Sequence, residues 1–249
     1  MIRVLLPLLL LLALPAKAEQ IVLGLSRDEV AITATFEGSD ILIFGAIKRE
    51  APVAPGQLGV IITIAGPDTP VVVRRKDRRL GIWVNTDAVE VDAAPSFYAV
   101  ASSGPLKDVL SDTEDLRNQV TIRRAIRSVG ATVDDSAAFT RALIRIRAGS
   151  ALYQVLEGEV DLEEDTLFRA SVQLPANLTE GDYAARILLT RDGSIVDEYQ
   201  TTIPVHKVGL ERWLYNLAHN NALLYGLMSL AIAIAAGWGA SAVFGLLRR

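Results

Sequence analysis

ALLYGLMSLAIAIAAGWGASAVFGLL, residues Ala222 to Leu247, contains no charged residue, and only Arg248 and Arg249 follow it. A helix needs roughly 20 apolar residues to cross the hydrocarbon core of a bilayer. The stretch therefore predicts one C-terminal transmembrane helix over residues 222–247. Because Lys and Arg are enriched on the cytoplasmic side of membrane proteins, residues 248–249 would be a cytoplasmic stub.

Small side chains crowd this span. Ala235 and Gly239 are four residues apart, as are Gly237 and Ser241, so each pair lines up along a helix. Small faces let a second helix approach closely, and close packing drives association in lipid. We expect these four residues to pack against an integral membrane partner or a second copy of the chain, with a lone anchor as the alternative.

Residues 207–221 precede the span and predict an amphipathic connector that could lie on the membrane. Trp213, Tyr215 and Tyr225 are candidates for the membrane interface, because Trp and Tyr are enriched at the level of the lipid headgroups. The lipid bilayer is therefore the first partner that the sequence predicts.

The N-terminus is the second apolar segment. Arg3, the apolar run Val4 to Leu14 and the triplet Ala16-Lys17-Ala18 are typical of a secretory signal peptide over residues 1–18. With the C-terminal span as a stop-transfer sequence, the bulk of the chain would lie outside the cytoplasm. The chain has no cysteine, which excludes disulfides, a thiol nucleophile and cysteine metal ligands. No eukaryotic sorting signal is visible, so we expect a bacterial inner-membrane protein with a periplasmic bulk.

The exported part is acidic and rich in predicted strands. The formal net charge of the chain is −4, which argues against nucleic acid as a partner. Short β-branched runs separated by Gly and Pro predict a mainly β fold with one or two Ig-like β-sandwich regions. The expected parts are a β region over 19–104, a two-helix insertion over 105–150, and a β region over 151–206 that completes the sandwich or forms a second one.

Local signals support these elements. Ser111-Asp112-Thr113-Glu114 is a capping-box pattern that predicts the start of one helix, and Asp134 or Asp135 could cap a second. Arg191-Asp192-Gly193-Ser194 predicts a tight hairpin, because Asp-Gly favours the turn types with positive φ.

The densest charge run is Arg74-Arg75-Lys76-Asp77-Arg78-Arg79, which lies between two predicted strands. Such a run is usually a solvated hairpin. The alternative is an anion or lipid-headgroup site formed by Arg74, Arg75, Arg78 and Arg79, because arginine binds phosphate and sulfate through two hydrogen bonds.

Catalytic and metal-binding patterns are weak. The two histidines, His206 and His219, have no spaced ligand cluster beside them. Ser102-Ser103 has no G-x-S-x-G motif, and Glu163-Glu164-Asp165 has no EF-hand spacing. The sequence therefore predicts no catalytic residue, no metal site and no cofactor.

Several short phrases together carry a family resemblance. They are Gly24-Leu25-Ser26, Phe44-Gly45-Ala46, Trp83-Val84-Asn85, Pro95 to Ser103, Leu167 to Ala170, Leu174 to Asn177, Gly181-Asp182-Tyr183, Lys207 to Trp213, Leu224-Tyr225-Gly226 and Gly237-Trp238. In this combination the chain resembles a family of alphaproteobacterial transmembrane proteins, and departs from it at Thr179, where a proline is expected. The resemblance implies a single membrane-anchored protein whose gene lies near genes for permeases of the sulfite-exporter type. It implies no catalytic residues.

These observations predict a non-enzymatic, membrane-anchored periplasmic protein that binds or assembles with a membrane partner such as a permease. The alternative is a tethered periplasmic module that binds an anion or another ligand. A hydrolase of envelope polymers has less support, because no catalytic set accompanies it.

Overall fold

The computed structural model describes residues 19–33, 36–50, 52, 55–127, 136–208 and 210–247, without the side chains of residues 210–212, 215, 216 and 242–247. The expected signal peptide, the cytoplasmic stub and the capping residues Asp134 and Asp135 lie outside the described residues. The chain divides into two compact units. The β-rich unit comprises Met1–Val30 and Glu37–Val205, and the anchor unit comprises Ala31–Phe36 and His206–Arg249.

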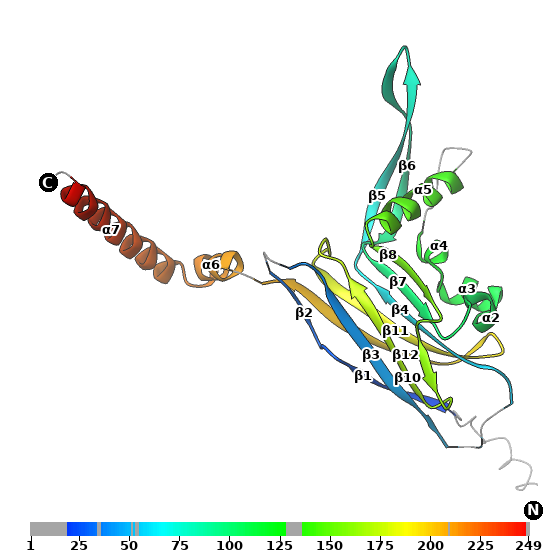
Figure 1. Cartoon of the computed structure of the whole chain (residues 1–249). Coiled ribbons are helices and arrows are strands. Elements are labelled where there is room, and N and C mark those ends of the chain that lie inside the picture. Colours follow the sequence, from blue (N-terminus) through cyan, green and yellow to red (C-terminus); the bar gives the residue numbers. More distant parts are fainter. Residues whose placement is uncertain are drawn as a thin grey trace, which may run out of the picture. The chain divides into compact units, whose positions relative to one another are not determined.

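The expected mainly β class, with a helical insertion and one C-terminal candidate membrane helix, is confirmed (Figure 1). The Ig-like topology within it stays a prediction. A four-stranded antiparallel sheet has the order β1 (Glu19–Leu25), β3 (Ser39–Arg49), β10 (Leu167–Leu174) and β9 (Asp161–Glu163). Strand β10 alternates between exposed and buried residues along its whole length, so this sheet buries one face.

A second sheet has six strands. Their order is β2 (Val30–Ile32), β12 (Ser194–Lys207), β11 (Gly181–Arg191), β4 (Leu58–Ala65), β7 (Tyr98–Ser102) and β8 (Tyr153–Glu157). Strands β7 and β8 are parallel, whereas β11 is antiparallel to both β4 and β12. Seven consecutive residues of β4 are buried, which requires that both faces of this sheet are covered.

The helical insertion covers one face of the six-stranded sheet. In place of the two helices expected, the described residues contain four, namely α2 (Leu106–Val109), α3 (Asp112–Asn118), α4 (Ile122–Ala125) and α5 (Ser136–Gly149). Ile61 and Leu188 of the sheet share one hydrophobic cluster with Ile122 and Leu143 of the helices. Neighbouring residues point to opposite faces of a strand, so the buried pair Ile62 and Ile187 lies on the other face. The unit thus has a helical layer on a two-sheet stack.

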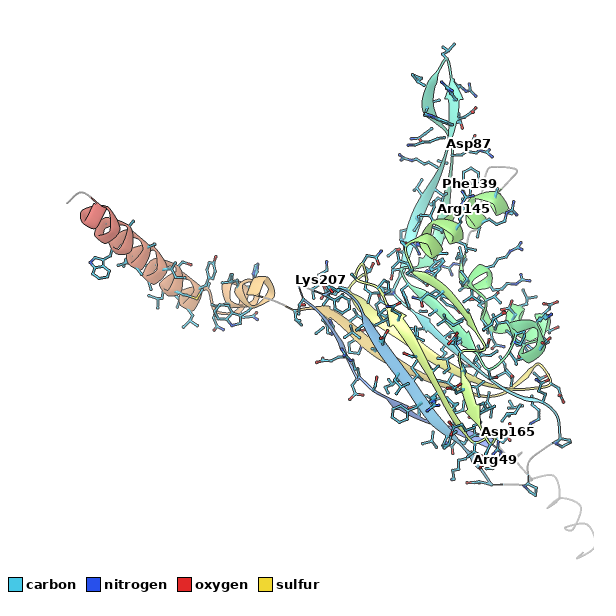
Figure 2. All side chains as sticks on the ribbon, in the orientation of Figure 1. Arg49, Asp87, Phe139, Arg145, Asp165 and Lys207 are labelled. Atoms are coloured by element: carbon cyan, nitrogen blue, oxygen red, sulfur yellow. The ribbon has the colours of Figure 1, made fainter. Side chains whose placement is uncertain are left out.

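A nearly buried charge cluster ties the two sheets together. The Glu19 Oε1 atom of β1 accepts hydrogen bonds from Arg49 Nε (3.1 Å) and from Arg191 Nη2 of β11 (2.7 Å). Arg49 also donates to Thr166 Oγ1 and to the carbonyl oxygen of Asp165, which lies beside it in Figure 2. Only 9% of the Glu19 side chain is exposed. The cluster therefore joins β1 and β3 of one sheet to β11 of the other.

A long hairpin extends from the β-rich unit. Strands β5 (Asp68–Arg79) and β6 (Ile82–Pro95) pair with each other and with no other strand in the described part of the chain. Figure 1 shows the far end of this hairpin standing clear of the two larger sheets. The turn contains only Leu80 and Gly81, both with positive φ. Arg74 to Arg79 therefore belong to β5 itself rather than to a loop between strands.

The anchor unit contains α6 (Leu210–Asn220) and α7 (Ala222–Leu247). Residues Ala222–Ser241 are long and apolar enough to cross a membrane, and none of that window is buried. Trp213 is 53% exposed and Tyr225 is 38% exposed, which suits the predicted interfacial role. The side chain of Tyr215 lies outside the described set.

Candidate functional site

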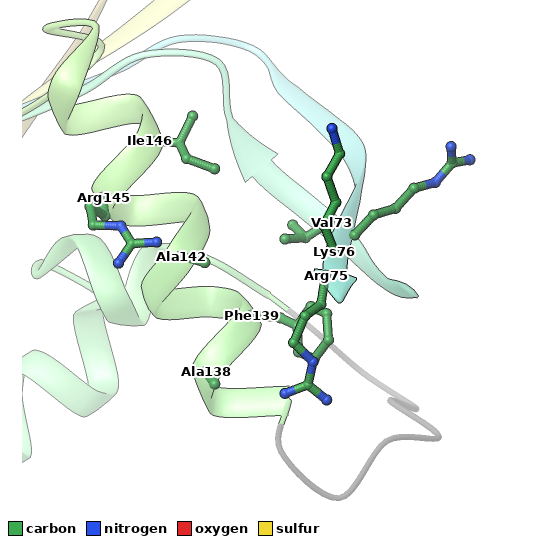
Figure 3. A pocket seen from close by; sticks show the side chains of 9 residues that line it. Val73, Arg75, Lys76, Ala138, Phe139, Ala142, Arg145 and Ile146 are labelled. Carbon is green, nitrogen blue, oxygen red and sulfur yellow. The ribbon is translucent and has the colours of Figure 1, made fainter. Parts of the chain in front are cut away.

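A cavity of about 290 Å³ lies between β5 and α5 in the β-rich unit (Figure 3). Its lining combines apolar and basic side chains, namely Val73, Arg74, Arg75, Lys76, Ala138, Phe139, Ala142, Arg145 and Ile146. The apolar members of α5 recur every three or four residues, which places them along one side of the helix. The cavity therefore has an apolar wall with a basic margin.

The C-terminal end of α5 is fixed to the base of the hairpin by Arg147. Its Nη1 atom donates to the carbonyl oxygen of Pro95 in β6 and to the hydroxyl of Tyr153 in β8 (2.7 Å). The Tyr153 hydroxyl in turn donates to the same Pro95 oxygen (2.9 Å). Burial raises the pKa of Tyr153, so this phenol stays protonated at neutral pH and keeps its donor. This network holds the wall of the cavity in place.

Arg75 joins the hairpin to α5 from within the cavity. Its Nη2 and Nε atoms donate to Asp87 Oδ2 at 2.8 and 3.0 Å, across the β5–β6 pair. The hydrogen bond from Arg75 is the main reason that the pKa of Asp87 is lowered. The Arg75 Cζ atom also lies 5.1 Å from the centre of the Phe139 ring, within the range of a cation–π contact. Arg75 is therefore already engaged by its own chain.

The four arginines predicted to bind an anion do not converge. Arg74 and Arg75 line the cavity, whereas Arg78 and Arg79 lie beyond it, next to the turn. No ion pair in the described part of the chain holds Arg74, Arg78 or Arg79. Figure 3 shows Arg75 and Lys76 extending in opposite directions. The cavity can thus offer scattered positive charge rather than a single anion cradle.

Sequence reasoning missed two members of this site, Lys76 and Arg145. Lys76 was part of the charge run, but nothing local indicated that it would border a cavity with α5. Arg145 was not singled out from the sequence. Their proximity depends on a hairpin folding against a helix about 70 residues later, which no local pattern encodes.

The residues considered for catalysis have structural roles. Ser102 Oγ donates to the Gly104 carbonyl oxygen (2.6 Å), and Ser103 Oγ accepts from the Val60 amide (3.0 Å). Glu163 pairs with Arg169 at the surface (3.5 Å). Among the described residues, no group of three or more His, Asp or Glu side chains could hold a metal ion.

Helix α7 has two unlike sides. At about 100° per residue, the small side chains Gly226, Ser229, Ala233, Ala236, Gly237 and Ala240 fall together on one side. The bulky side chains are spread over the rest of the circumference, among them Leu224, Leu227, Met228, Ile232 and Trp238.

The four residues predicted to pack a partner helix are divided around α7. Gly237 and Ser241 lie about 40° apart at the edge of the small side, whereas Ala235 and Gly239 lie together on another side. A Cβ atom built at Gly237 or Gly239 would meet nothing within 4 Å. Both backbones are therefore open to close approach from outside the chain.

Comparison with known families now adds one finding to this geometry. A family described as "Putative transmembrane protein (Alph_Pro_TM)" matches residues 20–245. No curated protein matches the chain. The family match extends over both units and includes α7 except its last two residues. The chain therefore belongs to this family of transmembrane proteins and is a single-pass membrane protein, with one candidate membrane helix among the residues that the structure describes.

Proposed function

We propose that this chain is an envelope protein whose β-rich unit is exported to the periplasm and whose anchor helix assembles with an integral membrane partner. The proposed partner class is a permease. The observation that carries the proposal is the small side of α7, because the bulky side chains lie on the rest of its circumference.

This asymmetry has a direct physical meaning in a bilayer. Lipid tails are as apolar as leucine, so hydrophobicity alone does not bring two membrane helices together. Close van der Waals contact does, and it requires small residues at the contact. The side with Ala233 and Gly237 satisfies this requirement, whereas the opposite side with Leu224 and Met228 suits lipid.

The proposed orientation places residues 19–206 in the periplasm, after removal of residues 1–18, and residues 248–249 in the cytoplasm. The two terminal arginines after α7 support this orientation. Because the chain has no cysteine, a single cysteine reports accessibility without background. A membrane-impermeant maleimide should label Leu80→Cys in intact spheroplasts and leave a C-terminal cysteine unlabelled, whereas the reverse pattern would refute the orientation.

The partner is tested by mild-detergent purification of the full-length protein from its native membrane, with mass spectrometry of the proteins that accompany it. We expect a stoichiometric multi-pass protein with the wild type. Ala233→Phe/Gly237→Phe should release it, because added bulk blocks close helix contact. The matched control Leu224→Phe/Met228→Phe adds bulk on the opposite side and should retain it. A wild-type preparation without a companion, or equal behaviour of both variants, would refute the proposal.

A second candidate function is a tethered anion-binding module, and the basic margin of the β5–α5 cavity favours it. It ranks second because Arg75 is occupied by Asp87. Sulfite, sulfate or phosphate should then raise the melting temperature of the full-length protein. Arg74→Gln/Lys76→Gln should abolish this effect and Lys107→Gln/Arg123→Gln should preserve it. The absence of any shift in the wild type would remove this candidate.

A further inference from the structure

The far end of the β5–β6 hairpin, residues 74–85, is termed here the hairpin tip, and its charge is opposite to that of the remaining chain. It contains five basic residues and one acidic residue, Asp77, which gives a net charge of +4. The whole chain carries −4, so everything outside the tip carries −8. Every residue from Arg74 to Arg79 is exposed. The hairpin tip is thus a projecting element with a net positive charge on an otherwise acidic chain.

The turn of the hairpin tip is apolar where turns are usually polar. Leu80 is 104% exposed, Ile82 64% and Trp83 68%. Leu80 and Gly81 have φ values of 50° and 87°, the geometry of a turn that favours Asn, Asp or Gly. A leucine in this left-handed region is strained, and here it also gains no burial. Such an outlier indicates that the side chain is kept for contact with something outside the chain.

Basic and apolar side chains are paired across the two strands of the tip. The strand register pairs Arg78 with Trp83 and Arg79 with Ile82. Residues paired across two strands lie on the same face, so each face of the hairpin carries one arginine beside one large apolar residue. Leu80 occupies the extreme end, Arg78 and Arg79 lie level with Trp83 and Ile82, and the remaining basic residues follow behind. This order matches the depth profile of a membrane interface, with hydrocarbon inside and anionic headgroups outside.

The inner end of the hairpin tip is held firmly. The Arg75–Asp87 pair crosses the two strands, and Phe139 of α5 packs under the Arg75 guanidinium. The tip therefore extends from a braced support, which reduces the ordering cost of binding.

We propose that the hairpin tip docks on the anionic surface of a lipid bilayer, with Leu80, Ile82 and Trp83 entering the interface and the neighbouring basic residues binding headgroup phosphates. Charge complementarity selects an anionic bilayer as the binding partner, because anionic lipid attracts a basic segment. The acidic remainder of the chain does not neutralise the tip. The proposal does not depend on the membrane partner proposed for α7.

The test uses the full-length protein, in which Leu80→Cys carries an environment-sensitive nitrobenzoxadiazole dye. The protein is reconstituted in nanodiscs of phosphatidylcholine alone or of phosphatidylcholine with phosphatidylglycerol. The comparison of these two nanodiscs tests whether the tip binds the bilayer that holds α7. Vesicles with phosphatidylglycerol are then added to the neutral nanodiscs. This second arrangement tests whether the tip binds a bilayer other than the one that holds α7. We expect a blue shift and brighter emission when phosphatidylglycerol is present in at least one of these two arrangements.

Matched variants decide whether the shift belongs to the tip. Each basic residue near an anionic surface contributes roughly a fivefold change in binding, so Arg78→Glu/Arg79→Glu should largely abolish the shift. The control Lys107→Glu/Arg123→Glu carries the same charge change elsewhere on the β-rich unit and should retain it. Dye on Leu116→Cys, which replaces an exposed leucine of α3, should not respond.

Three results would overturn the proposal. They are no shift in either arrangement, an equal shift with phosphatidylcholine alone, and an equal response from the dye at position 116. Because the tip residues are exposed, these variants should melt at the wild-type temperature, which a circular dichroism scan verifies before the lipid measurements.

Discussion

The charge cluster at Glu19 leads to a sharp prediction about the stability of the β-rich unit. Glu19→Gln keeps the shape of the side chain and an acceptor oxygen, but removes the negative charge shared by Arg49 and Arg191. These three side chains are 9 to 13% exposed. The substitution therefore removes the carboxylate that two nearly buried guanidinium groups share.

The size of the effect follows from this burial. Removing one partner of a buried ion pair costs about 3–5 kcal/mol, because the remaining charge is left uncompensated. The amide oxygen of Gln can still accept a hydrogen bond, so we expect the lower end, about 3 kcal/mol. At roughly 2–4 °C per kcal/mol for a unit of this size, the melting temperature should fall by about 6–12 °C.

Thermal unfolding of the full-length protein in detergent, followed by the β signal in circular dichroism, measures this change. Glu163→Gln is the matched control, because Glu163 and its partner Arg169 are both 60% exposed. Exposed pairs contribute about 0–1 kcal/mol, so this control should melt within a few degrees of the wild type. Equal losses for the two variants would refute the reasoning that burial sets the cost.

Further predictions concern packing and ionisation. Gly45→Ala places a Cβ atom 2.4 Å from Phe168 Cζ and should cost about 1–3 kcal/mol of unfolding free energy, whereas Gly149→Ala, with nothing within 4 Å, should cost less than that. Phe139→Ala removes a side chain that is 3% exposed and should cost about 3–5 kcal/mol, with faster hydrogen exchange in β5 and α5. Burial raises the pKa of Tyr98, so its contribution to stability is complete below the unfolded value near 10 and is lost as the pH rises above it. Ultraviolet titration should show this phenol ionising later than an exposed tyrosine, and simultaneous ionisation would contradict the prediction.

The two tight hairpins show what sequence can predict and where it fails. Asp192 and Gly193 adopt positive φ between β11 and β12, as the Asp-Gly signal predicted. Leu80 and Gly81 adopt the same kind of turn, but leucine carries no such signal. The charge run before Leu80 was therefore expected between strands, although it forms part of β5. Because residues 74–79 of that strand are exposed on both faces, no alternation of apolar residues marked this half.

Local chemistry also predicted the capped helix start. Ser111 Oγ accepts from the Glu114 amide (3.4 Å), as the capping pattern indicated. The pairing of parallel strands β7 and β8 had no such signal, because α2 to α5 separate them in the chain. The candidate site depends on this kind of long-range contact, since α5 must return to the hairpin to form the cavity. Residue types alone identified its arginines but not their partners.

The order of strands in the two sheets has a consequence for biosynthesis. Strand β3 has β10 as a neighbour and β4 has β11, so these strands cannot complete their pairing until residues 167–191 have left the ribosome. Non-local pairing of this kind slows folding, and open strand edges favour aggregation meanwhile. The apolar run of β4 would be the most exposed segment during this interval. The nascent chain should therefore depend on a holdase chaperone until its last strands are made.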